Sequence, residues 1–151
     1  MSKKKQITDK RNDVVKKSNV TVKKSLVSFN FMYLTDNKEH NFDFFRKDMR
    51  ERHDAYQELC KRLKELSCNN MDFWKKAGKL RGCEPIPYES FSDTFKSILS
   101  QIEIVSTDSQ LAVFRFSNSD YRIIGKAGIF EENTIYIIGF DFNHSAYNHG
   151  S

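Results

Sequence analysis

Three segments near the C-terminus constrain the fold of this chain most strongly, because they are rich in β-branched and aromatic residues and are separated by polar turn sequences. The segments are Leu111 to Ser117, Tyr121 to Gly125 and Thr134 to Phe142. Asn118-Ser119-Asp120 separates the first two, and Glu131-Glu132-Asn133 precedes the third. Such residues favour strands, and short turns join antiparallel neighbours. The pattern predicts an antiparallel meander.

The region before the meander predicts a strand followed by a long helix. Residues Leu26 to Leu34 alternate between two faces, one more apolar than the other, as in a strand. Apolar residues then recur at three- and four-residue steps from Phe42 to Leu66, with Lys and Arg between them. This spacing predicts a long amphipathic helix, with Asn41 as its N-terminal cap.

Two shorter helices are expected before the meander. Apolar residues at helical spacing predict one from residue 73 to residue 80 and another from residue 91 to residue 102, capped by Ser90. Pro85-Ile86-Pro87 must be extended between them, since a proline disfavours helix at the preceding residue. The order of elements predicts an α+β fold, in which helices pack on one face of an antiparallel sheet.

Positive charge gathers at the N-terminus. The 151 residues include 25 Lys and Arg against 20 Asp and Glu, a net charge of +5. Residues 1–25 hold nine basic and two acidic residues, a net of +7, which leaves −2 for the other 126. We therefore expect a basic flexible arm over residues 1–24 and a single α+β domain over residues 25–151. The arm is either a solvated tail or a source of salt-dependent affinity for nucleic-acid phosphates.

The absence of certain segments and motifs from the sequence excludes several classes of protein. No apolar run approaches the roughly 18 residues of a membrane helix, and no apolar stretch follows the N-terminal lysines as in a signal peptide. We expect a cytoplasmic protein with no membrane partner. Phosphate-loop, dinucleotide-binding, zinc-protease and serine-hydrolase motifs are absent. Cys60, Cys68 and Cys83 lack the close pairing of a structural zinc site, so we expect no metal ion and no cofactor.

His144 is the histidine whose neighbours in the sequence indicate a functional site. It follows the apolar segment Ile135 to Phe140 and lies between Asp141 and Tyr147. A site is commonly built where a rigid strand leaves a sheet and carries polar groups to its end. The alternative is that His144 and Tyr147 close the edge of the sheet and hydrogen-bond to the backbone.

The other histidines favour structural or unassigned positions. His53 falls on the apolar stripe of the long helix, which predicts a packed core histidine. His40 is expected in a turn and His149 in the tail, with no neighbour that gives either a role.

Arg115, Arg122 and Lys126 lie inside predicted strands, where a charge is costly without a partner. Arg122 and Lys126 share a strand face. Either nearby acids such as Asp141 pair with these cations, or the cations surround an anion. A guanidinium donates two parallel hydrogen bonds that match a phosphate.

The meander resembles the RelE/ParE superfamily of bacterial toxins. The resemblance rests on Phe114-Arg115-Phe116, on Tyr121-Arg122-Ile123-Ile124-Gly125, on the apolar segment ending at Phe140, and on His144 to Tyr147. In that superfamily helices pack on an antiparallel sheet, an arginine-bearing strand precedes a hydrophobic one, and a terminal His or Tyr ends the chain. The resemblance implies metal-independent cleavage of mRNA, typically on the ribosome, and an antitoxin partner.

The resemblance also implies roles for individual residues. His144 would be the general acid or base, and Tyr147 a proton donor or stacking group. Arg122 with Arg115 would stabilise the charged phosphate in the transition state. Lys126 would hold the RNA backbone as a substrate-binding residue. Independently of the resemblance, Tyr121 is a second substrate-binding candidate, as a ring that stacks on a single-stranded base; the alternative is that its ring packs in the core.

Two other interpretations remain open. One is a non-catalytic regulator of a mobile element or phage, which binds nucleic acid or protein through an aromatic sheet or a basic helix. The other is an immunity or adaptor protein that binds one partner through the long helix. The enzyme interpretation predicts that His144, Tyr147, Arg122 and Arg115 lie within about 10 Å of one another in an open pocket. Arginines paired with acids on a flat surface would argue against it.

Overall fold

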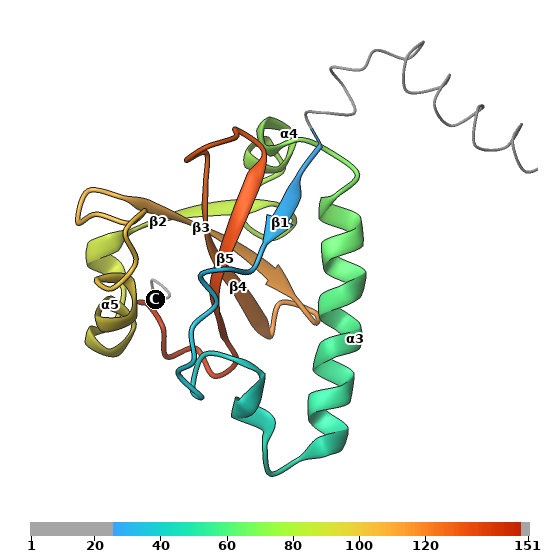
Figure 1. Ribbon diagram of the computed structural model, residues 1–151. Helices are drawn as coiled ribbons and strands as arrows, with labels where there is room; N and C mark the ends of the chain where they lie inside the picture. The colour runs from blue at the N-terminus through green and yellow to red at the C-terminus, as the bar shows by residue number, and fades with distance from the viewer. Residues whose placement is uncertain (1–25, 149–151) are drawn as a thin grey trace, which may run out of the picture.

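A computed structural model describes residues 26–148 as an α+β fold, the class expected from the sequence (Figure 1). The strands are β1 (Ser28–Asn30), β2 (Cys83–Pro87), β3 (Gln110–Phe116), β4 (Tyr121–Ala127) and β5 (Thr134–Asp141). The α-helices are α3 (Met49–Leu66), α4 (Met71–Lys76) and α5 (Asp93–Leu99), and the 3₁₀ helices are η1 (Phe42–Phe45) and η2 (Tyr88–Ser90). The predicted arm over residues 1–24 lies outside the described residues.

The five strands form one sheet in the order β1-β5-β4-β3-β2. The pairs β2–β3, β3–β4 and β4–β5 are antiparallel, which confirms the predicted meander. However, β1 pairs with β5 in parallel, so the sheet is mixed rather than wholly antiparallel. A tight turn forces antiparallel pairing only between strands that it joins, and β1 and β5 are separated by the helices and by three strands.

Helices cover both faces of the sheet rather than one. Phe114 and Ile123 are fully buried on the face that packs against α3, α4 and η1, which we call the α3 face. Val113 and Ile124 are fully buried on the opposite face, which packs against α5 and which we call the α5 face. The central strands are apolar on both sides, and a strand buried on both sides needs a covering layer on each.

The segment predicted as one helix from Phe42 divides into two elements. The Asn41 side chain does act as a cap, since it accepts a hydrogen bond from the Asp43 backbone N–H at 2.8 Å, but it begins only η1. Asp48 starts α3 separately and accepts from the Glu51 backbone N–H at 3.0 Å. Two capping side chains seven residues apart therefore replace the single cap that we predicted.

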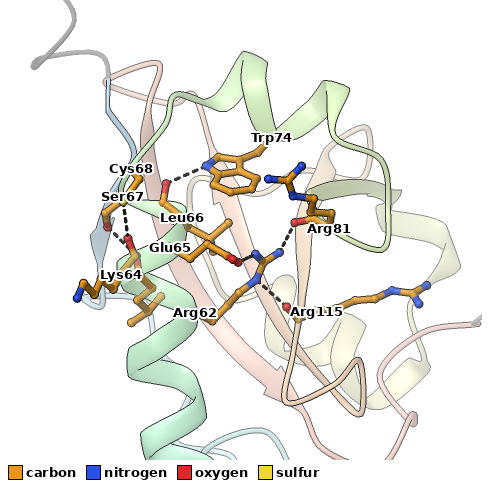
Figure 2. A network of polar contacts seen from close by, with 10 residues as sticks. Arg62, Lys64, Glu65, Leu66, Ser67, Cys68, Trp74, Arg81 and Arg115 are labelled. Atoms are coloured by element: carbon orange, nitrogen blue, oxygen red, sulfur yellow. Dashed lines mark hydrogen bonds and ion pairs between the residues drawn. The ribbon is translucent and has the colours of Figure 1, made fainter.

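Arg62 ties α3 to the sheet and to the α4–β2 connection (Figure 2). Its Nε donates to the Arg115 carbonyl at 2.7 Å and its Nη2 to the Arg81 carbonyl at 2.6 Å, while Nη1 pairs with Glu65. The guanidinium also lies 5.5 Å from the centre of the Trp74 ring. This network fixes the end of β3 that carries Arg115.

Candidate functional site

Arg115 and Arg122 lie beside each other because the β3–β4 register places them directly opposite. Asp141 of β5 lies directly opposite Arg122. Residues opposite each other on antiparallel strands project to the same face. Arg115, Arg122 and Asp141 therefore form one row across three strands on the α5 face, which we call the charged row.

Arg115 is the partly accessible member of the charged row. Its side chain is 17% exposed and pairs with Glu84 of β2, at 4.0 Å between Nη2 and Oε1. Its Nε is buried and donates to no acceptor within residues 26–148. The unpaired Nε costs free energy in the folded state, and a ligand can reach only the exposed part of the Arg115 side chain.

Arg122 is buried and holds Tyr147. Its Nε donates to the Tyr147 hydroxyl at 3.2 Å, and its Nη1 donates to the backbone carbonyls of Ser119 and Tyr121. Burial raises the pKa of Tyr147, although the Arg122 hydrogen bond opposes that shift. The phenol therefore stays protonated at neutral pH.

Asp141 positions the loop that carries His144. Its two carboxylate oxygens accept hydrogen bonds from the backbone N–H groups of Ser145, at 3.0 Å, and Ala146, at 3.2 Å. The Ala146 carbonyl in turn accepts from the Ser92 N–H at 2.8 Å, which joins the loop to the start of α5. His144 is exposed in this loop and has φ of 59°, a conformation that residues other than glycine adopt infrequently.

The structure does not bring Lys126 and Tyr121 to the charged row. Lys126 shares the α5 face but lies four residues from Arg122, about 13 Å along the strand. Its Nζ donates to the Gln110 carbonyl at 3.3 Å, and burial lowers its pKa. Tyr121 lies on the α3 face, where its ring packs against Phe142.

Three pockets, of about 570, 440 and 480 Å³, open among the described residues. Of the six predicted site residues, Arg115 alone lines one of these three, the 440 Å³ pocket between α3 and the β3–β4 turn. The 480 Å³ pocket is rich in aromatic residues, including Phe31 and Tyr56, which the sequence analysis did not assign to a site. The only sign of this pocket in the sequence is the run of aromatic residues before α3, together with Tyr56 in that helix.

Within residues 26–148, no group of three or more His, Cys, Asp or Glu side chains could hold a metal ion. No helix in the same range is long and apolar enough to cross a membrane. Comparisons with family models, with curated proteins and with solved structures found no match.

Proposed function

We propose that the protein is a toxin-like endoribonuclease that cleaves mRNA in the cytoplasm by metal-independent attack of the 2′-hydroxyl, and that an antitoxin protein neutralises it. The observation that supports this proposal is the exposure of His144 on a loop that Asp141 anchors beside Arg122 and Tyr147. An imidazole suits proton exchange near neutral pH, and arginines suit a phosphate.

In the proposed reaction, His144 accepts the proton of the 2′-hydroxyl, whose oxygen then bonds to the adjacent phosphorus. The bond from phosphorus to the 5′-oxygen breaks, and that oxygen takes up a proton from water. The products are a 2′,3′-cyclic phosphate and a 5′-hydroxyl. Arg115 is partly exposed whereas Arg122 is buried, so Arg115 is the arginine suited to stabilise the phosphate.

Arg122 and Tyr147 act in this proposal as positioning residues. They are 4% and 5% exposed, which leaves little surface for a substrate. Their hydrogen bond joins β4 to the C-terminal segment that follows the His144 loop. Loss of either side chain would therefore loosen the loop and displace the imidazole.

The test is induced expression in a bacterial host, with purified protein assayed on RNA in the presence of a chelator. Wild type should arrest growth and leave 2′,3′-cyclic phosphate ends, whereas His144→Ala should do neither. His53→Ala is the matched control, because His53 is also exposed but lies on α3. Normal growth and intact RNA with wild-type protein would reject the proposal.

A second candidate is a regulator that binds nucleic acid or protein without catalysis. It is favoured by the pairing of Arg115 with Glu84 and by the burial of Arg122, because both arginines then have structural partners. RNA binding that leaves the RNA intact would support this candidate over the enzyme.

A further inference from the structure

The 480 Å³ pocket lies between α3 and the segment that leads from β1 to η1. Four aromatic residues line it: Phe31, Phe42, Tyr56 and Phe140. The rings of Phe42 and Tyr56 stack nearly parallel, with their centres 3.9 Å apart and an angle of 8°. Phe31 and Tyr56 remain 45% and 42% exposed. Large aromatic surfaces thus face solvent at a concave site, where an unoccupied apolar surface is costly.

Polar groups surround the rings. Arg52 donates from Nη2 to Asp43 Oδ1 at 3.4 Å, and its guanidinium lies 5.8 Å from the centre of the Tyr56 ring. Arg46 donates from Nη1 to the Asp43 carbonyl at 2.9 Å, so a second guanidinium lies beside the pocket. Asp36 adds an exposed carboxylate to the lining. Flat rings, the Arg52 guanidinium and hydrogen-bond acceptors therefore line one site, and Arg46 lies next to it.

We infer that this pocket binds a nucleobase of single-stranded RNA, an inference that rests on the proposed function for the identity of the ligand. A base would stack on the exposed rings of Phe31 and Tyr56, and stacking on an aromatic side chain is the main source of affinity for single strands. Asp36 would accept a hydrogen bond from an exocyclic amine, and Arg46 and Arg52 would contact the adjoining phosphates.

The size of the pocket agrees with this ligand. Pockets of about 300 to 1,000 Å³ are typical for small ligands, so 480 Å³ has room for one nucleotide. Arg52 lines the pocket and Arg46 is hydrogen-bonded to the Asp43 backbone at its edge, so two cations are available for phosphates, while Asp36 and Asp43 in the lining are carboxylates. Aromatic rings with cations beside them are the usual combination in proteins that bind single-stranded nucleic acid.

The test measures the affinity for two fluorescein-labelled, single-stranded 2′-O-methyl RNA octamers by fluorescence anisotropy. One octamer carries adenine bases, and the other is abasic with the same phosphates. Wild type should bind the adenine octamer about tenfold more tightly than the abasic one. Phe31→Ala and Tyr56→Ala should each remove most of that difference and leave the affinity for the abasic octamer unchanged.

Three controls make the result decisive. Tyr56→Phe keeps the ring and should keep the affinity, and Phe130→Ala removes an aromatic side chain that is 70% exposed outside the pocket and should change nothing. Phe31 lies after β1 with an exposed ring, so Phe31→Ala should melt at nearly the wild-type temperature. Equal affinity for the two octamers, no binding of either, or full affinity in Phe31→Ala would overturn the inference.

Binding and cleavage are separated by the choice of probe. A 2′-O-methyl group removes the attacking hydroxyl, so neither octamer can react by the proposed mechanism. His144→Ala should therefore bind the adenine octamer as wild type does. Base-dependent binding by a protein that cleaves no RNA would support the pocket and reject the enzyme, whereas cleavage without base-dependent binding would do the reverse.

Discussion

Arg62 is a buried charge that satisfies two backbone carbonyls from different parts of the chain. Replacing it in Arg62→Met keeps the volume but leaves these carbonyls without their donor and removes the contact with Trp74. We expect the free energy of unfolding to fall by about 2–4 kcal/mol in urea denaturation. Lys61→Met, the neighbouring control, removes an exposed pair with Glu58 and should cost about 0.5 kcal/mol or less. Equal losses in the two variants would contradict the role of Arg62.

The histidines show why single residues are difficult to assign from a local pattern. His53 was predicted in the core and is exposed, so that prediction was wrong. His40 had no role in the sequence analysis, yet it is 2% exposed and its Nδ1 lies 3.0 Å from the Phe140 carbonyl. Periodicity indicates only the type of element and the face on which a residue lies. It cannot identify a contact such as that of His40, whose partner is 100 residues away. The hydrogen bond between Arg122 and Tyr147 could not be predicted for the same reason, because these residues are 25 positions apart.

At the scale of elements, the N-terminal cap of α5 is a different serine from the predicted one. Ser90 was the predicted cap, but the structure places the cap at Ser92, whose hydroxyl accepts from the Phe95 N–H at 3.2 Å. Ser92→Ala should therefore lower the free energy of unfolding by about 1 kcal/mol. Ser90→Ala is the matched control, since Ser90 belongs to η2, and it should leave that free energy nearly unchanged. The reverse order in thermal or urea unfolding would show that α5 begins earlier.

The strands of the meander were predicted to within about two residues because each alternates clearly and ends at polar turn residues. The edge strands were harder to predict. The predicted strand Leu26 to Leu34 shortens to Ser28–Asn30, since the Asn30 side chain accepts from the Met32 N–H at 2.9 Å and turns the chain. Cys83–Pro87 was expected to be extended only at its prolines, yet it forms β2. Prolines are tolerated there because β2 lies at the edge of the sheet.

At the scale of the whole molecule, the sequence predicted the class of fold but not the side on which each helix packs. Val113 and Phe114 are both fully buried, on opposite faces of β3, so the strand pattern cannot say where α5 packs. The alternation in β4 did predict that Arg122 and Lys126 share a face. Their separation along that face follows from the rise of a strand, whereas the exposure of His144 depends on how the C-terminal loop returns to α5.

Cys83 links the stability of the whole molecule to pH, because its thiol is buried in β2 within the core that α4 covers. Burial raises the pKa of its thiol from 9.0 to about 11, so the folded protein holds this proton more tightly than the unfolded chain does. The associated stability is fully present below pH 9 and is lost as the pH rises through 11. The free energy of unfolding of wild type should therefore fall relative to that of Cys83→Ala, by about 2 kcal/mol at pH 11. Urea titrations of both proteins between pH 8 and 11 measure this difference, and a constant difference across that range would show that Cys83 is already hydrated in the native state.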